Sequence, residues 1–141
     1  MSKYTSKIGK VKKSEATIYN FLSDFNNLKA VIPADKVTDF ESTEDTCKFN
    51  IQGVGQAGLK IIEKEENKLI KITSDGKSPF SFFFWIQLKP MEEEEGTTAI
   101  RLTIDANLNP MMKMMVGKHM QKGIDSILDQ VVVFFNEKIK E

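Results

Sequence analysis

The stretch NIQGVGQAGLKII, residues 50–62, decides between two fold classes, because Gly53, Gly55 and Gly58 give it the spelling G-x-G-x-x-G. In a dinucleotide-binding unit this spelling follows a strand and opens a helix, and the N-terminus of that helix holds the pyrophosphate. Here residues 59–64 continue as strand-like sequence, without an N-cap residue or a helical stripe. The stretch therefore predicts a glycine-rich connection inside an antiparallel sheet, where missing Cβ atoms allow a sharp bend, and it argues against a nucleotide site.

Alternation of apolar and polar residues surrounds this stretch from about residue 37 to residue 108, which is typical of half-buried strands. Residues 68–73 predict one strand, ended by the turn sequence of residues 74–77, and residues 98–106 predict another. Between them, one face of a long strand carries five apolar residues: Phe80, Phe82, Phe84, Ile86 and Leu88. The connections are too short for crossover helices, so about six antiparallel strands are expected in this part of the chain.

The residues before this region predict a first strand and two short helices. Residues 3–12 are typical of a polar edge strand, and Ser14 is a good N-cap for the helix that follows. The apolar stripe of that helix repeats at helical spacing: Ile18, Phe21, Leu22 and Phe25. A second helical piece, residues 27–32, should end at Pro33, which cannot continue a helix.

The C-terminal part of the chain predicts one long helix. Asn109 is an N-cap residue, and Pro110 suits the first helical position, so the helix should run from residue 110 to about residue 140. Its expected buried stripe consists of Val116, Met120, Ile124, Ile127, Val131 and Phe134. Lys113, Lys118, Lys122 and Asp129 are expected on the opposite side. This helix is the only predicted element long enough to cover one face of a curved sheet.

Composition excludes several functional classes. The chain of 141 residues fits one domain, residues 1–141, and its formal net charge of zero argues against a nucleic-acid partner. A single cysteine, Cys47, fits a reducing compartment, and no run of about 18 apolar residues predicts a membrane helix. We therefore expect a cytoplasmic protein without stable membrane insertion.

Three segments together carry a family resemblance: SKYTSKIGKVKKSEATIYNFLSDFNNLKAVIP, VTDFESTEDTCKFNIQGVGQAGLKIIEK and NPMMKMMVGKHMQKGIDSILDQVVVFF. In pattern and order they resemble the START and birch-pollen-allergen superfamily, also called the helix-grip or SRPBCC fold, which includes polyketide cyclase-like proteins. The resemblance implies an α+β fold, in which a curved antiparallel sheet of about seven strands wraps around the long C-terminal helix. Two short helices would follow the first strand. It also implies a cavity between the sheet and the helix that binds a hydrophobic molecule.

Strand parity, helical phase and this resemblance together predict the lining of the cavity. The expected ligand-binding residues are Phe21, Phe49, Phe82, Phe84, Leu102, Met112, Val116 and Met120, with His119 as a polar contact. The expected ligand is a small apolar or amphipathic molecule of lipid-like character, because apolar burial would supply the affinity. We expect the protein to bind it without catalysis. The methionines at residues 111, 112, 114, 115 and 120 suit either a pocket lining or ordinary packing.

Two alternatives to simple binding remain open in the sequence. A cyclase or dehydratase would need an acid or base inside the cavity, whereas Arg101, Thr103 and Asp105 alternate with apolar residues and should face solvent. One histidine and one cysteine predict no metal site, no cofactor and no catalytic triad. If Phe83 and Trp85 point outward, they predict a homodimer contact; the opposite strand register would place them in the cavity.

Overall fold

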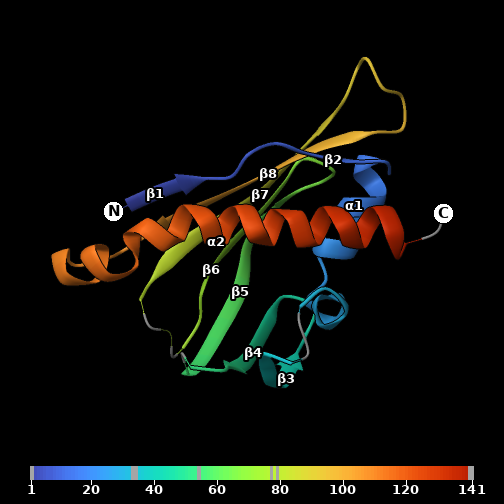
Figure 1. Ribbon diagram of the computed structural model, residues 1–141. Coiled ribbons are helices and arrows are strands. Elements are labelled where there is room, and N and C mark those ends of the chain that lie inside the picture. The colour runs from blue at the N-terminus through green and yellow to red at the C-terminus, as the bar shows by residue number, and fades with distance from the viewer. Residues whose placement is uncertain (1, 33–34, 54, 77, 79, 140–141) are drawn as a thin grey trace.

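The computed structural model describes residues 2–32, 35–53, 55–76, 78 and 80–139, and it has the helix-grip architecture that the sequence predicts (Figure 1). A curved antiparallel sheet wraps around one long helix, and two short helices lie near the C-terminal end of that helix. In chain order the elements are β1 (Ser2–Thr5), β2 (Gly9–Val11), α1 (Glu15–Leu22), the 3-10 helix η1 (Phe25–Ala30), β3 (Val37–Ser42), β4 (Thr46–Ile51), β5 (Gly55–Glu65), β6 (Leu69–Ser74), β7 (Phe82–Pro90), β8 (Thr98–Ala106) and α2 (Pro110–Glu137).

The sheet has eight strands in the order β1-β8-β7-β6-β5-β4-β3, with β2 also paired to β8. The extra strand arises because the strand predicted for residues 3–12 is interrupted. At the break, the backbone N–H of Ser6 donates to the carbonyl of Leu102 at 2.8 Å, and the Ser6 hydroxyl accepts from the N–H of Leu102 at 2.9 Å. The Ser6 hydroxyl thus takes the place of the backbone carbonyl that would accept from Leu102 in a regular strand pair. The strand is interrupted at this point, and Ile8 is 64% exposed.

The glycine stretch forms the connection between β4 and β5, as the antiparallel interpretation predicts. Gly53 and Gly55 have φ values of +81° and +115°, a region that favours glycine, and Val54 between them lies outside the described residues. Gly58 pairs with Lys48 within the β4–β5 ladder, and a Cβ atom there would clash with the backbone carbonyl of Asp75. Since β5 continues as a strand to Glu65, no helix N-terminus is available for a phosphate.

Both short helices begin at side-chain caps. The Ser14 hydroxyl accepts from the N–H of Thr17 at 3.2 Å, as predicted. The second helix is a 3-10 helix that begins at Phe25 rather than at residue 27, because the Asp24 carboxylate accepts from the N–H of Asn26 at 2.9 Å and starts the turn earlier. Pro33, the expected end of this helix, lies outside the described residues.

Helix α2 begins as predicted, with the Asn109 side chain accepting from the N–H of Met112 at 2.8 Å. In the second half its predicted stripe is confirmed at Ile124 and Val131, which are buried, and wrong at Ile127, which is 46% exposed, and at Phe134, which is half-buried. Leu128 and Phe135 are buried in their place. The stripe is rotated because α2 packs against β1, β2 and β8 at one side of the sheet, not against the middle of its concave face.

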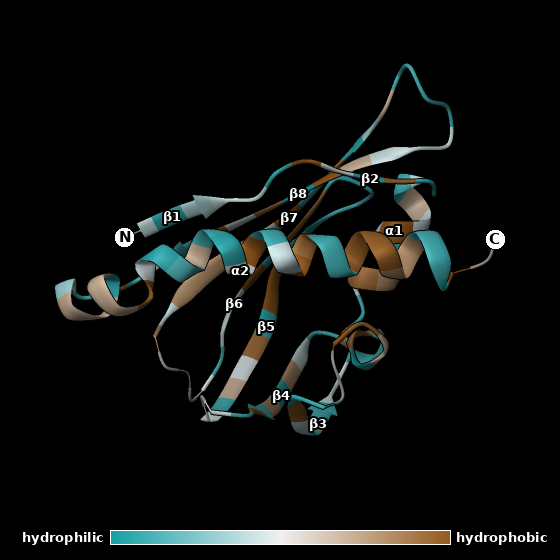
Figure 2. Ribbon diagram, in the orientation of Figure 1, coloured by the Kyte–Doolittle hydropathy of each residue, from teal (hydrophilic) through white to brown (hydrophobic). Residues whose placement is uncertain are grey.

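The hydrophobic stretches of the chain gather where α2, α1 and the central strands meet. In Figure 2 the most hydrophobic part of α2 is its C-terminal half, beside α1, whereas the first turns extend beyond the sheet. Gly9 in β2 permits the close approach of α2, because a Cβ atom there would lie 2.6 Å from Cγ2 of Val132. One side of α2 is therefore closely packed, and the side facing β4 and β5 borders a cavity.

The last strand of the sheet, β3, has an irregular ladder with β4. The pairing register shifts between Thr38 and Glu41, and Asp39 between them has a φ of +56°. This combination is a β-bulge, which bends the strand and increases its local twist.

Candidate ligand-binding site

An apolar cavity lies between the concave face of the sheet and α2, and it consists of two adjoining compartments. Their volumes are about 340 Å³ for the compartment next to η1 and about 350 Å³ for the compartment next to the middle of α2. The two share six lining residues: Phe49, Leu59, Phe82, Phe84, Ile104 and Ile127. Because the shared residues come from β4, β5, β7, β8 and α2, the two compartments adjoin each other across the middle of the sheet.

The first compartment is closed on one side by α1 and η1. Leu22 and Phe25 lie at its wall, and it is covered by Leu28 of η1 and by Val31 and Ile32, which follow η1. The strands supply further apolar side chains, among them Leu102, which is 1% exposed. The capped 3-10 turn brings three aliphatic side chains over the sheet within five residues, so this short helix acts as one wall of the site.

The second compartment opens beside α2. His119, Met120 and Gly123 line it from the helix, and Phe80 and Ser78 line it from the segment before β7. A Cβ atom at Gly123 would meet no atom within 4 Å, apart from its own chain neighbours and helix backbone. Glycine in a helix interior costs about 1 kcal/mol relative to alanine, and here it enlarges the cavity.

Few polar groups reach the lining of the two compartments. Among the described residues, the polar ones in the lining are Ser78, His119 and Gln130, and none of the described lining residues carries a carboxylate or an ammonium group. The Ser78 hydroxyl oxygen is buried and has no hydrogen-bond partner among the described residues. His119 is exposed at the edge of the second compartment. Such walls favour apolar contact and leave a charged ligand group without a partner.

The structure brings six of the nine predicted binding residues together at this cavity. Phe49, Phe82 and Phe84 line both compartments, Leu102 lines the first, and His119 and Met120 line the second.

The other three predicted residues do not line it. Phe21 packs against Phe134 and Phe135, with ring centroids 5.2 and 5.5 Å apart, in an aromatic cluster near the end of α2. Met112 and Val116 are half-buried on the first turns of α2.

Several lining residues were missed by reasoning from the sequence. Ile104 has the same strand parity as Leu102, so that pattern could have identified it. The lining residues from η1 and Gln130 could not have been identified in this way. Their place depends on how the 3-10 turn and the rotated helix pack against the sheet. Ile127 was assigned to the core, whereas it lines both compartments.

The outer face of the sheet shows which register β7 adopts. Phe83 and Trp85 lie on this face, with their ring centroids 6.1 Å apart, and Phe83 is 36% exposed. Lys71 Nζ lies over both rings, 4.8 Å from the Phe83 centroid and 5.4 Å from the Trp85 centroid. The register with Phe83 and Trp85 outside the cavity, which the sequence favoured, is therefore the observed one.

The polar residues of β8 also lie on the outer face, but they are not all solvated as expected. Arg101 is exposed, whereas Thr103 is only 6% exposed. Thr103 is paired with Trp85 across the strands, and its hydroxyl donates to the Gln87 side chain at 3.2 Å. One carboxylate oxygen of Asp105 is buried without a hydrogen-bond partner among the described residues. Asp105 is paired with Phe83 across the strands.

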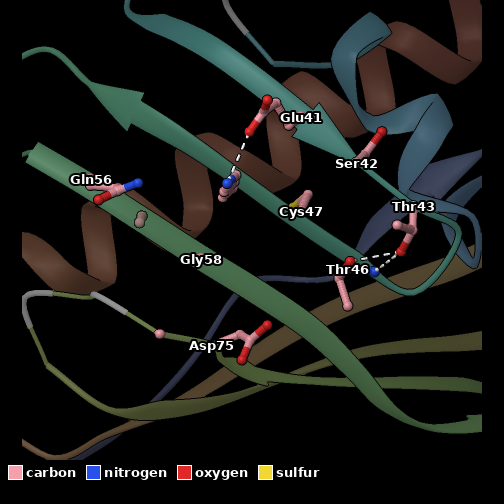
Figure 3. Close-up of a pocket in the computed structure, with 11 residues that line it drawn as sticks. Glu41, Ser42, Thr43, Thr46, Cys47, Gln56, Gly58 and Asp75 are labelled. Carbon is pink, nitrogen blue, oxygen red and sulfur yellow. Dashed lines mark hydrogen bonds and ion pairs between the residues drawn. The ribbon is translucent and has the colours of Figure 1, made fainter.

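A separate depression of about 420 Å³ lies on the outer side of β3, β4 and β5, with the helix behind the strands (Figure 3). Glu41 and Lys48 form an ion pair at 3.0 Å in its wall, and the hydroxyls of Thr43 and Thr46 are 2.7 Å apart. Burial raises the pKa of the nearby Cys47 thiol to about 12, so this cysteine is not a thiolate nucleophile at neutral pH. These polar groups satisfy one another, and the inner cavity is the stronger candidate site.

Two further observations concern the described part of the chain as a whole. It contains no group of three or more His, Cys, Asp or Glu side chains placed to hold a metal ion. No helix in it has the length and apolar character that crossing a bilayer requires.

Solved structures with this architecture cover nearly the whole chain. The Aha1 dimer from Colwellia psychrerythraea is 20% identical, with a TM-score of 0.74, and the match covers 99% of this chain and 100% of that one. Norcoclaurine synthase from Thalictrum flavum is 13% identical, with a TM-score of 0.75 and coverage of 99% and 98%. A START superfamily protein from Mycobacterium smegmatis is 16% identical, with a TM-score of 0.66 and coverage of 92% and 96%. At these identities the likeness shows the START and birch-pollen-allergen-like fold alone.

Comparison of the sequence itself gives a family. No curated protein sequence matches the chain. The family model for CoxG, which is described as a subunit of carbon monoxide dehydrogenase, matches residues 9–140, nearly the whole chain. The chain therefore belongs to the CoxG family.

Proposed function

We propose that this protein binds a small hydrophobic or amphipathic, lipid-like molecule in the cavity between the sheet and α2, without catalysing its conversion. The observation that carries the proposal is the adjoining pair of compartments, whose shared walls are entirely aromatic and aliphatic. A ligand there would exchange water for apolar side chains, at about 25 cal/mol per Å² before the costs of association. The part-exposed Ile127, at the opening of both compartments, is apolar surface that a ligand would cover.

The first experiment is native mass spectrometry of freshly purified protein, followed by titration with the fluorescent apolar probe Nile red. We expect a co-purified molecule in the lipid mass range, or saturable Nile red binding once that molecule is removed. Protein that carries no adduct and binds no probe would contradict the proposal.

A filled-cavity variant connects binding to this site. Gly123→Leu places a side chain in the open space beside the second compartment and should weaken Nile red binding by about tenfold, equivalent to about 1.4 kcal/mol. Lys122→Leu is the matched control, because Lys122 is exposed on the same helix and does not line the cavity. Equal loss in both variants would place the probe elsewhere on the helix surface.

The cyclase or dehydratase alternative requires a proton donor or acceptor beside the ligand. Among the described residues that line the cavity, His119 is the one titratable candidate, and it is exposed. A His119→Ala variant that binds ligand but loses a measured conversion would favour the enzyme over the carrier.

We also propose self-association through the outer-face pair Phe83 and Trp85. The exposed ring of Phe83 supports this, and the structurally similar Aha1 is a dimer. Light scattering should show a dimer for the wild type and a monomer for Trp85→Ala. A wild-type monomer at tens of micromolar would contradict it.

Residues 1–141 are proposed to act as a single domain in the cytoplasm. One sheet contains all the described strands, and the single cysteine, Cys47, is buried and free.

A further inference from the structure

The first compartment of the cavity meets a groove on the outside of the protein. This groove, of about 540 Å³, runs between η1 and the C-terminal half of α2. Val31 and Gln130 line both the groove and the first compartment. The first compartment and the groove therefore meet at this pair of residues, where Gln130 is exposed, and this boundary is the candidate opening of the cavity.

Gln130 is placed to meet a polar group at this opening. Its carboxamide can donate and accept hydrogen bonds, and it forms none with another described residue. The other polar lining residues are less suitable. The Ser78 oxygen is covered by its neighbours, and His119 lies at the opposite end of the cavity.

The charges around the opening favour an uncharged group. Asp129 in the groove is paired with Lys7 at 2.8 Å, which also raises the pKa of the Lys7 ammonium through that hydrogen bond. The dipole of α2 adds little at Gln130, because its effect is confined to the last turn of the helix, which ends at Glu137. Lys138 lines the far end of the groove, about 12 Å along the helix from Gln130 at roughly 1.5 Å per residue. An ionised head at Gln130 would therefore have no unpaired charge next to it among the described residues that line the groove and the inner walls.

We infer that the ligand of this cavity is an elongated, uncharged amphiphile, whose apolar body fills the two compartments and whose polar end lies at Gln130. This inference rests on the proposed binding function and adds to it the class and orientation of the ligand. The compartments and the groove follow one another from Phe80 and His119 to Val31 and Gln130, so a chain-like molecule fits them better than a compact one.

The test compares three ligands of equal chain length, 1-dodecanol, dodecanoate and n-dodecane, by displacement of Nile red at pH 8. We expect 1-dodecanol to bind the wild type more tightly than dodecanoate. Gln130→Leu should weaken the binding of 1-dodecanol by about five- to tenfold, which corresponds to the loss of one hydrogen bond between uncharged groups. The affinity for n-dodecane should be unchanged. Lys122→Leu is the matched control, because Lys122 is exposed on the same helix and is absent from the lining, and it should change neither affinity. His119→Leu tests the other end of the cavity as the place of the polar group. All three substitutions are at exposed positions, and melting curves check that each variant is folded.

Three outcomes would overturn this inference while leaving the proposed function intact. Loss of 1-dodecanol affinity in His119→Leu alone would place the polar end at the other opening. Equal losses for 1-dodecanol and n-dodecane in Gln130→Leu would show that Gln130 only packs against the chain. Tighter binding of dodecanoate by the wild type would show that the head is anionic. Wild-type protein that binds neither Nile red nor any of the three ligands would instead overturn the proposed function itself.

Discussion

The two halves of α2 differ sharply in burial, although both are rich in apolar residues. In the second half, Leu128 and Phe135 are fully buried. In the first half, Met111, Met114 and Met115 are 71%, 82% and 66% exposed. The difference teaches that apolar residues on a helix become a core only where another element offers a facing surface, and α1 and the sheet bury the second half of α2 more fully than the first.

Polar contacts also hold α2 mainly in and beyond its middle. The Asp125 carboxylate accepts from the backbone N–H of Lys7 at 2.8 Å, and the Asn136 side chain accepts from the N–H of Lys12 at 2.8 Å. Gln121 donates to the carbonyl of Thr5 at 2.8 Å. These bonds fix one side of α2 to the β1–β2 edge, so the opposite side can border the cavity without losing its position.

The largest effect should come from removing a buried side chain in the second half. Leu128→Ala should lower the free energy of unfolding by about 3 kcal/mol, because it deletes core methyl groups and leaves a cavity. Met114→Ala in the first half should change it by less than about 0.5 kcal/mol. Urea unfolding of both variants measures the difference. Similar losses would show that the two halves are equally buried in solution.

A smaller loss should follow from separating α2 and β2. Gly9→Ala places a Cβ atom against Val132 and should cost about 2 kcal/mol, as overpacking usually does. In the double variant with Val132→Ala, part of this loss should be recovered, because the clashing methyl group is gone. Additive losses in the same unfolding assay would argue that the helix does not lie this close to β2.

At the boundary of the two halves, a stabilising change is expected. Gly123→Ala should raise the free energy of unfolding by about 0.5–1 kcal/mol, because the open space accepts the methyl group and alanine favours the helix. Gly117→Ala is the control, and its Cβ atom would meet the Tyr4 hydroxyl at 3.4 Å, so its gain should be smaller. A loss for Gly123→Ala would mean that this side of α2 is packed.

The smallest effect concerns the exposed contact of Asp125. The hydrogen bond from the Lys7 backbone N–H, followed by the bond from Gln121, lowers the pKa of the Asp125 carboxyl. A lowered folded-state pKa adds stability above the ordinary aspartate pKa of about 4, and this stability is lost as the pH falls through the lowered value. Thermal unfolding should therefore show Asp125→Asn less stable than the wild type at pH 7, with the gap narrowing at pH 3. A gap independent of pH would argue against a role for the carboxylate charge.

Local signals made much of the fold predictable. Ser14 and Asn109 mark helix starts through their own side chains, and the alternation around Phe84 fixes the face of β7. What could not be predicted depends on distant partners. The break near Ser6 is set by Leu102 in β8, and the rotated stripe of α2 is set by its position over β2.

The residues of the candidate site also include some that local sequence signals could predict and some that they could not. Strand parity identified Phe49, Phe82 and Phe84, because a strand alternates strictly between two faces. Met112 and Val116 were placed at the cavity by helical phase alone, but phase does not tell where along a helix the sheet ends. Gln130 gave no signal in the sequence, since its position at an opening exists only once η1 and α2 are packed.

The bulge in β3 affects how the protein behaves at high concentration. As the last strand in the sheet order, β3 presents backbone N–H and C=O groups that could pair with a strand of another molecule. The left-handed turn at Asp39 interrupts that row, and the exposed side chains of Thr38 and Glu41 flank it. This edge is therefore a poor template for growth of an intermolecular sheet. The sheet is open at β3, but the bulge protects the protein from aggregation through that strand.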